Sequence, residues 1–440
     1  MTRKNWILTI VLLSYCVTAI DASIVTTGLT LIKHDLQLTQ VSLSWIQNAY
    51  LLAFGGMVLL GGRLGDLLGR KRVFMVALIL FGVGSLFAGI SQDASLMISA
   101  RFVQGIGAAL LAPTSLALLM DTFDGHALVK AIAWYSSVSG IGTSIGMVLG
   151  GLFASALSWR YGFFINVPLA LFMIVVAWRT LPTQALQRTS FDAAGAITSM
   201  LALFSLVYTI NGATNWLAWG LLTLILLGLF VGIEQRQAHP MLPLSLFTDR
   251  NRRHAYLVRA LFVGSMMGYF LFAAEYLQTA LHFTPLLTGF GFVPLTFVTF
   301  LAALRVPDSV ARWGERRVAL VGMGFLLLGF IMTIPLVGTR NYWLAIGLPM
   351  ILLGLGQGFA MSPLTNLGIQ HVRLADSGAA SGLVNAAHQV GGSIGLSLMV
   401  ALTGEATVMT VAFKQAMVVG LVLNGIGLIL TLTLRRDKQA

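Results

Sequence analysis

With 57% hydrophobic and only 10% charged residues in a length of 440, the chain is too apolar to be an ordinary soluble domain. Its formal net charge of +12 does not indicate a nucleic-acid partner, because the cations lie in short segments between apolar runs. There they orient a membrane protein and face anionic lipids, which we expect as partners. The single cysteine, Cys16, excludes an internal disulfide and a thiolate metal site, and we expect neither metal nor cofactor.

The apolar runs are long enough to cross a membrane, which takes roughly 20 residues each. The first run follows Arg3 and Lys4 as in a signal peptide, but it is too long and lacks a small-residue cleavage site. We therefore expect it to be retained as a helix and predict an all-α integral membrane protein with 14 transmembrane helices. The runs lie near residues 6–30, 43–61, 73–91, 98–119, 131–156, 161–180, 191–211, 216–233, 255–278, 286–304, 318–337, 342–364, 377–402 and 410–433.

A glycine-rich basic segment, Gly61–Val73, separates the second and third runs. Its four cations predict that it is cytoplasmic. Its single acid, Asp66, is placed to pair with Arg70 or to lie at a neighbouring helix N-terminus. The alternative is a generic basic loop. The residues to which we assign a role in conformational change are Gly62, Asp66, Gly69, Arg70 and Lys71.

The distribution of charge predicts the orientation of the whole chain. With the N-terminus inside, the basic groups of residues 61–72, 236–253, 305–317 and 435–438 all face the cytoplasm. Only Lys33, Arg160, Arg340 and Lys414 then lie at or near the outer side. We predict a multi-pass protein of the inner (plasma) membrane with both termini cytoplasmic.

Three motifs of the first half return in the second half at offsets of 245, 249 and 249 residues. Such spacing predicts two parallel six-helix bundles with two extra helices between them, as in transporters built from repeats. The domains are 1–181 (N-terminal bundle), 182–254 (linker with two inserted helices and a basic cytoplasmic loop) and 255–440 (C-terminal bundle). The motif pairs are Gly69–Val73 with Gly314–Val318, Gly105 to Pro113 with Gly354 to Pro363, and Ser144–Gly146 with Ser393–Gly395.

Ionisable side chains deep in membrane spans are functional candidates by default. Asp21 lies about 20 Å into the first helix, where burial favours the neutral acid and permits proton loading and release. Arg101 reaches a similar depth from the opposite face and would be its counter-charge. The alternatives are an acid near the outer headgroups and a snorkelling arginine. We predict that Asp21 and Arg101 couple transport to protons.

Other polar residues of the spans are candidates for a substrate cavity. Glu275 would attract cations or take part in proton coupling, or it is an ordinary rim acid. His388 would titrate or bind substrate, or it is a satisfied hydrogen-bonding residue between helices. The predicted cavity residues are Glu275, His388, Gln104, Asn385 and Gln389. Small residues in the fifth span permit close, movable helix packing; they are Gly142, Gly146, Gly150 and Gly151.

Several of these segments resemble the major facilitator superfamily, and within it the fourteen-spanner drug:proton antiporters. The basic segment resembles the superfamily's loop signature, and the resemblance implies that the arginine of the fourth-helix motif acts in proton coupling. Two departures stand out: Met147 replaces the usual proline of the fifth-helix motif, and Glu275 replaces an apolar residue. The similar segments are Asp21–Val25, Trp45–Tyr50, Arg101–Pro113, Gly142–Gly151 and Trp159–Pro168.

We therefore predict a proton-coupled secondary transporter, not an enzyme, that exports amphipathic drugs or small organic compounds by alternating access. The alternative is a dedicated exporter or flippase for one metabolite, antibiotic or lipid. A receptor or scaffold would not need the repeats or an embedded acid, and no nucleotide-binding signature indicates ATP. The expected partners are a small amphipathic substrate, protons and lipids, and we expect a monomer.

Overall fold

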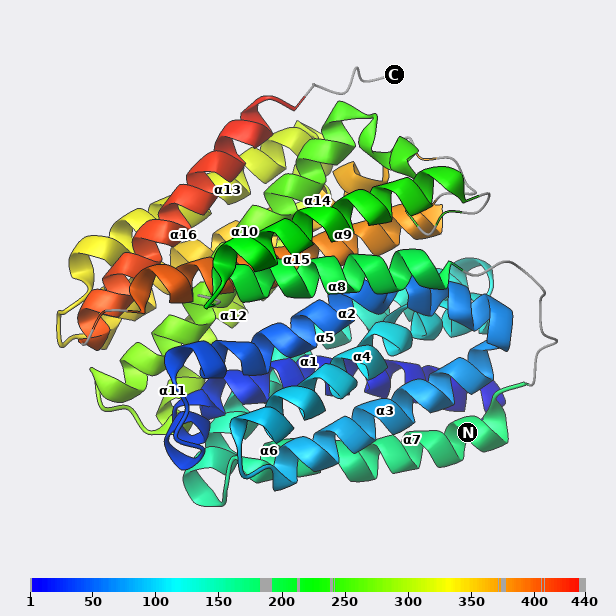
Figure 1. Cartoon of the computed structure of the whole chain (residues 1–440), viewed down its shortest axis with the longest axis horizontal. Helices are drawn as coiled ribbons and strands as arrows, with labels where there is room; N and C mark the ends of the chain where they lie inside the picture. The colour runs from blue at the N-terminus through cyan, green and yellow to red at the C-terminus, as the bar shows by residue number, and fades with distance from the viewer. Residues whose placement is uncertain are drawn as a thin grey trace.

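The computed structural model describes residues 2–182, 192–211, 214–237, 240, 242–370, 372, 377–404, 406 and 408–434. These residues form helices and contain no strand (Figure 1). We name the end of the molecule at which α1 begins, at Arg3, the near end, and the end at which it finishes, at Asp35, the far end.

The N-terminal group of helices fills the blue and cyan part of Figure 1. Its members are α1 (Arg3–Asp35), α2 (Gln40–Leu68), α3 (Arg70–Ile90), α4 (Ala94–Thr122), α5 (Gly125–Ala156), α6 (Arg160–Phe164) and α7 (Asn166–Thr180). The green pair is α8 (Ala193–Ile210) and α9 (Trp216–Arg236). The C-terminal group comprises α10 (Arg250–Thr279), α11 (Pro285–Gly291), α12 (Val293–Trp313), α13 (Glu315–Leu336), η2 (Trp343–Gly347), α14 (Leu348–Ile369), α15 (Ser377–Thr403) and α16 (Met409–Leu432).

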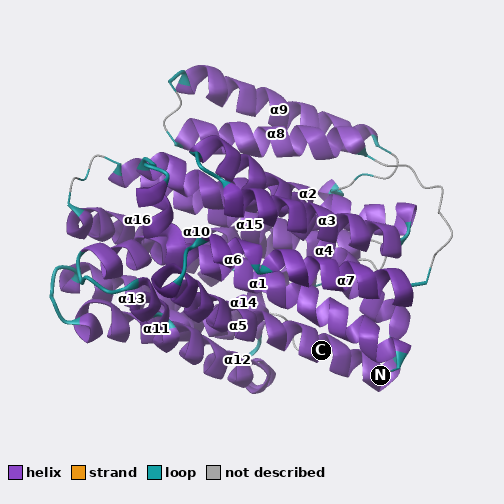
Figure 2. Cartoon of the chain, turned by 90° about the horizontal axis from the view of Figure 1, so that it is seen from below, coloured by secondary structure: helices purple, strands orange, loops and turns teal. Residues whose placement is uncertain are grey.

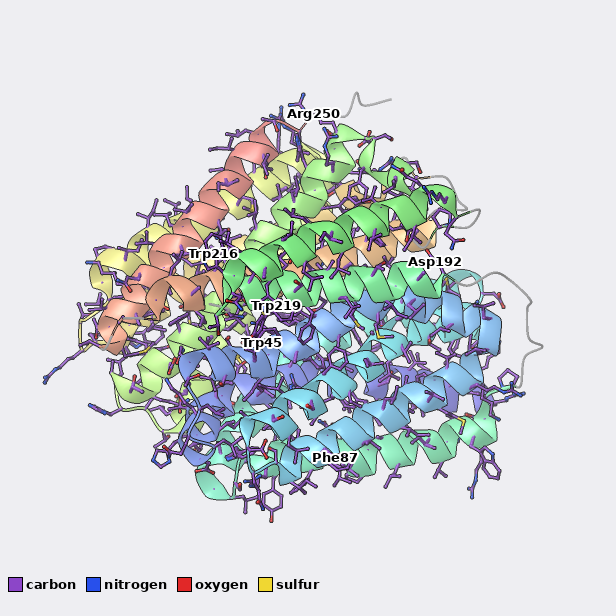
Figure 3. The ribbon with its side chains drawn as sticks, viewed as in Figure 1. Trp45, Phe87, Asp192, Trp216, Trp219 and Arg250 are labelled. Carbon is purple, nitrogen blue, oxygen red and sulfur yellow. The ribbon has the colours of Figure 1, made fainter. Side chains whose placement is uncertain are left out.

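Eleven helical segments of the described chain are long and apolar enough to cross a membrane. The sequence predicted fourteen crossings. In α15 the polar residues Asn385, His388 and Gln389 lower the hydropathy, and the described apolar parts of α5 and α8, Ile145–Ala156 and Ala194–Ile210, are shorter than a full span. The outward face of α3 carries exposed apolar side chains such as Phe87, which suits contact with lipid (Figure 3).

The basic segment and its repeat adopt the same unusual backbone conformation. Gly69, between α2 and α3, has φ of 85°, and Gly314, between α12 and α13, has φ of 78°. Only glycine takes this conformation without strain, so each glycine permits one helix to stop and the next to begin at once. The echo between Gly69 and Gly314 in the sequence therefore marks equivalent turns.

The other repeated glycines make equivalent helix contacts. A Cβ atom on Gly105 of α4 would lie 2.5 Å from the carbonyl oxygen of Tyr50 in α2. A Cβ atom on Gly354 of α14 would lie 2.6 Å from the carbonyl oxygen of Leu295 in α12. Likewise, α5 packs on α1 and α15 packs on α10. The packing of the N-terminal group thus recurs in the C-terminal group.

The pair α8 and α9 stands at one edge of the molecule (Figure 2). The two helices pack on each other, and α8 also contacts α2 and α15. Aromatic rings join the pair to α2: Trp45 lies 5.1 Å from Phe204 and 6.2 Å from Tyr208, whose ring lies 4.8 Å from Trp219 (ring centroids; Figure 3). The pair therefore covers the junction between the two groups of helices and packs its buried apolar residues against both groups.

The boundary predicted at residues 254 and 255 falls inside a helix. Helix α10 begins at Arg250, because the Asp249 carboxylate accepts a hydrogen bond of 2.9 Å from the Arg252 N–H and caps the helix. A short 3₁₀ helix, η1 (Leu244–Phe247), precedes this cap. The C-terminal group therefore begins earlier than hydropathy alone indicated.

Candidate functional site

A fully buried carboxylate stands at the centre of the N-terminal group. Asp21 of α1 is 0% exposed, and its Oδ2 accepts a hydrogen bond of 2.6 Å from Arg101 Nη1 of α4. Its Oδ1 accepts hydrogen bonds from Gln104 Nε2 at 2.7 Å and from Asn166 Nδ2 at 2.8 Å. Three donors from two helices thus converge on one acid.

The partners of Asp21 are themselves held in place. Arg101 donates through Nη1 to Gln104 Oε1 at 2.6 Å and through Nε to the Ile46 carbonyl at 3.2 Å. Its guanidinium lies over the Tyr50 ring, 4.4 Å from the centroid. Gln104 also donates to Ser85 Oγ at 2.8 Å. Side chains from five helices therefore fix the geometry of this ion pair.

Helix geometry explains why residues so far apart in sequence meet. At 1.5 Å per residue, Asp21 lies roughly 27 Å from the start of α1 at the near end. Arg101 lies about 10 Å from the start of α4, which begins at the far end. The two helices run in opposite directions, so Arg101 approaches Asp21 from the far end, and the ion pair of 2.6 Å shows that the two side chains meet, as the sequence predicted for this pair. Their role in proton coupling stays a prediction.

The network suits an ionised acid. A carboxylate accepts but does not donate, and here every neighbouring group donates to it. Protonation of Asp21 would leave the Arg101 guanidinium, 2% exposed, without a counter-charge. Removing one partner of a buried ion pair costs about 3–5 kcal/mol, so a proton on Asp21 favours any rearrangement that gives Arg101 a new partner or water. The site can thus couple protonation to a change in shape.

Sequence reasoning missed two members of this network. Asn166 at the start of α7 donates to Asp21 Oδ1, and both Asn166 and Gln104 donate to Ser85 Oγ. An asparagine within the apolar stretch Gly162–Pro168 was the available signal for the first. Nothing in the sequence pointed to Ser85, because a serine within a membrane helix commonly bonds to the backbone of its own helix. Ser85 also does this, donating to the Phe81 carbonyl at 2.8 Å.

Two predicted cavity residues have other surroundings in the structure. Gln104 is 0% exposed and belongs to the Asp21 network. Glu275 is 5% exposed at the far end, where Oε1 accepts from Lys33 Nζ at 2.6 Å and Oε2 accepts from Gln40 Nε2 at 2.8 Å. Because Lys33 and Gln40 belong to the N-terminal group and Glu275 to the C-terminal group, this cluster ties the two groups together.

The remaining predicted cavity residues lie along α15. His388 is half-buried, and its Nδ1 is shielded from solvent without a hydrogen-bond partner among the described residues. Asn385 is exposed and donates to the Ser381 carbonyl of its own helix at 3.2 Å. Gln389 packs closely against α2: a Cβ atom on Gly55 would lie 2.9 Å from the Gln389 Cβ. Of these residues, His388 is the one left with an unsatisfied buried atom.

A further buried cation escaped the sequence analysis. Arg259 of α10 is 5% exposed and donates through Nη1 to the Met361 carbonyl at 2.9 Å and to Thr365 Oγ1 at 2.5 Å, both on α14. In the sequence it lies in the predicted span 255–278, close to Arg250, Arg252 and Arg253, and no role was predicted for it. Its position ten residues into a long helix was the signal that could have found it.

The glycines of the fifth span serve close packing. A Cβ on Gly146 would lie 2.7 Å from the Ile20 carbonyl oxygen of α1, and a Cβ on Gly142 would lie 3.1 Å from the Ala19 Cβ. Gly150 likewise faces α1, whereas Gly151 faces the Pro285 backbone of α11 in the C-terminal group. One helix thus contacts both groups through glycines, and α5 runs unbroken through Met147.

The basic segment contacts the near ends of α4 and α7. Arg70 forms an ion pair with Asp121 and donates to the Ala117 carbonyl at 2.9 Å, both on α4. Lys71 Nζ donates to the Trp178 carbonyl at 2.7 Å. The predicted pairing of Asp66 concerns a side chain that lies outside the described part. No group of three histidine, cysteine or acidic residues that could hold a metal occurs among the residues described.

Many apolar helices around a buried, fully hydrogen-bonded ion pair define the class of multi-pass membrane transporters. The chain belongs to the Major Facilitator Superfamily, whose family model matches residues 11–396. Members of this family are transporters and not enzymes, and the chain is likewise a transporter.

The relatives of the chain include an antibiotic resistance protein and an antibiotic export protein. It is 34% identical to the puromycin resistance protein pur8 of Streptomyces alboniger, over 92% of this chain and 83% of that protein. It is 33% identical to the cephamycin export protein CmcT of Amycolatopsis lactamdurans, over 88% and 82%. A solved structure of the nucleoside transporter NupG matches with a TM-score of 0.66 at 15% identity, over 99% of this chain and 98% of that one, and shows the fold alone.

Proposed function

We propose that this protein is a proton-coupled secondary transporter that exports amphipathic drugs or small organic compounds across the plasma membrane by alternating access. The observation that carries the proposal is the Asp21–Arg101 pair, buried at 0% and 2% exposure and held by Gln104 and Asn166. An acid in this position can exchange a proton only when the surrounding helices move. Proton transfer and conformational change are then one event.

The proposal includes the layout predicted from the sequence. Fourteen transmembrane helices form two six-helix bundles with α8 and α9 as the inserted pair, as in the fourteen-spanner drug:proton antiporters. Both termini and the basic segment face the cytoplasm, so the near end is cytoplasmic and the far end is external. The even number of inserted crossings keeps both bundles in the same orientation.

Contacts at the far end support a state that is closed to the outside. The cluster of Lys33, Gln40 and Glu275 joins the two groups there. Gln278 Nε2 of α10 donates to the Thr27 carbonyl of α1 at 3.1 Å. We propose that export begins from this state: substrate enters from the near end, and these contacts break when the far end opens.

In the proposed cycle, the Asp21–Arg101 pair is intact while the far end is closed. Opening of the far end admits a proton to Asp21, and Arg101 then leaves it for water or another acceptor. Release of the proton from Asp21 to the cytoplasm at the near end restores the pair. The free energy of the proton gradient thus drives release of the substrate outside. Substrate and proton thus move in opposite directions.

The test is transport by everted membrane vesicles from cells that express the protein. A generated proton gradient should drive uptake of ethidium or puromycin, and collapse of the gradient should stop it. Vesicles with Asp21→Asn should accumulate neither compound against its gradient. Uptake that is indifferent to the gradient in wild-type vesicles would refute proton coupling.

A dedicated exporter for one compound is the second candidate, because the relatives named above are each associated with a single antibiotic, puromycin or cephamycin. The same vesicles separate the two candidates. A multidrug exporter should accept ethidium and several unrelated compounds, whereas a dedicated exporter should accept one compound and its close analogues.

A further inference from the structure

Arg259 presents an unused hydrogen-bonding edge. A guanidinium has five N–H donors, of which two are on Nη1, and these serve the Met361 carbonyl and Thr365 Oγ1. Nε is shielded from solvent and has no partner in the described chain, and neither of these two hydrogen bonds uses Nη2. The Nε–Nη2 edge, which forms paired hydrogen bonds with a carboxylate or phosphate, is therefore free.

The charge of Arg259 is also unbalanced within the described chain. No carboxylate of the described residues forms an ion pair with Arg259. Arg101, the other buried arginine of the spans discussed above, contrasts with it, because Asp21 neutralises that charge. A buried cation without a counter-ion is costly, so such a cation in a membrane span is expected to have an anionic partner at some stage of its function.

Other groups at the same level would complete a binding site. Counted along helices that all begin at the near end, Tyr15, Tyr135, Arg259 and His388 lie roughly 14 to 18 Å from their helix starts. Tyr15 and His388 lie within electrostatic range of Arg259. The site would thus draw on α1 and α5 of one group and on α10 and α15 of the other.

These neighbours supply both apolar surface and unsatisfied polar atoms. The rings of Tyr15 and Tyr135 stack with centroids 4.2 Å apart and planes 13° apart, which gives a flat apolar surface. Buried atoms without a partner among the described residues include His388 Nδ1 and Gln357 Oε1, one turn before Met361 on α14. An unsatisfied buried polar atom in a native protein calls for a ligand or water.

We propose that Arg259 binds the acidic end of an amphipathic substrate, a carboxylate or a phosphate, while Tyr15 and Tyr135 contact its apolar part. This inference rests on the export function proposed above and adds amphipathic anions to the classes of compound that it exports. It also separates two tasks: Asp21 and Arg101 handle protons, and Arg259 recognises the transported compound. Because residues from both groups face the ligand, binding would bias their relative position.

The test compares two probes that differ only in the acid. N-dansylglycine carries a carboxylate and N-dansylglycinamide a neutral amide, and dansyl emission reports binding to the purified full-length protein in dodecylmaltoside micelles. Because hydrogen bonds to a charged group are strong, the wild type should bind the acid about 10- to 100-fold more tightly than the amide. Equal affinities for the two probes in the wild type would overturn the proposal.

Variants assign the preference to Arg259. Arg259→Gln should abolish the preference for N-dansylglycine over N-dansylglycinamide. Arg259→Lys should retain part of this preference, because lysine keeps the charge but not the two parallel N–H donors. The exposed control Arg305→Gln should retain all of it. A purely structural tether between α10 and α14 would instead change the melting temperature and leave the ratio of the two affinities unchanged. If Arg259→Gln does not fold, Arg259→Lys and the wild-type ratio still decide.

Further measurements distinguish a lipid phosphate from a soluble organic acid as the ligand, and failure of the Arg259 site from failure of the export function. Displacement of N-dansylglycine by phosphatidylglycerol identifies a lipid headgroup phosphate as the ligand, whereas no displacement identifies a soluble organic acid. Specific binding of N-dansylglycine without gradient-driven export would refute the export function and leave the site standing. Unchanged ethidium export in Arg259→Gln together with an unchanged acid preference would refute the site and leave the export function standing.

Discussion

Replacement of Asp21 by asparagine tests the buried network most sharply. In the wild type, three donors share the two carboxylate oxygens of Asp21. Asparagine keeps the shape of the acid but has only one acceptor oxygen for these three donors. Its amide nitrogen must face either Arg101 or the pair Gln104 and Asn166, all of which donate. The Arg101 charge also loses its counter-ion at 2% exposure. We expect a loss of about 3–5 kcal/mol in the free energy of unfolding.

The double variant Asp21→Asn with Arg101→Gln separates stability from coupling. It removes both charges, so it should recover a large part of the lost stability, and a double-mutant cycle should give a favourable interaction between Asp21 and Arg101. It should nevertheless fail to export against a gradient, because it has no titratable acid. Thermal unfolding in detergent and uptake by everted vesicles measure the two properties. An Asp21→Asn protein that is as stable as the wild type and still exports uphill would refute this reasoning.

Three other predictions concern gating, packing and topology. Glu275→Gln leaves Lys33 without its carboxylate and should speed opening of the far end, measured as faster exchange between open and closed states by single-molecule fluorescence; unchanged exchange would deny the cluster a gating role. Gly146→Leu should destabilise the protein by about 1–3 kcal/mol because its Cβ would meet the α1 backbone, whereas Gly228→Leu, with nothing within 4 Å, should be neutral in the same unfolding assay. Reporters fused after residues 188 and 436 should read cytoplasmic and one after Asn215 external, and a cytoplasmic reading at Asn215 would remove the inserted helix pair.

The parts of the fold that follow from regular geometry were predictable. Helices rise by a constant amount per residue, so counting along two opposed spans placed Asp21 and Arg101 at a similar depth before the structure showed their contact. The turn at Gly69 and its echo at Gly314 were predictable because a basic glycine segment between two spans has few alternatives. These inferences required no knowledge of side-chain partners.

Features that depend on specific long-range partners were not predictable. Nothing in the sequence connects Glu275 with Lys33, 242 residues away, so its ion pair could not be distinguished from a cavity acid. Helix α10 begins at Arg250 because of the Asp249 cap, which hydropathy does not register. Arg259 lies close to three other arginines in the sequence, which does not show that the Met361 carbonyl and Thr365 accept its hydrogen bonds. For Glu275 and Arg259 the deciding contacts join helices whose relative rotation the sequence alone does not specify.

Proton exchange with the solution on substrate binding tests the central claim most directly. Purified protein in a weakly buffered solution with a pH-sensitive dye is mixed with a compound that the vesicle assay has shown to be exported. The wild type should exchange protons with the solution on binding, and Asp21→Asn should bind the compound without doing so. Equal proton exchange by the wild type and by Asp21→Asn would show that Asp21 is not the proton carrier.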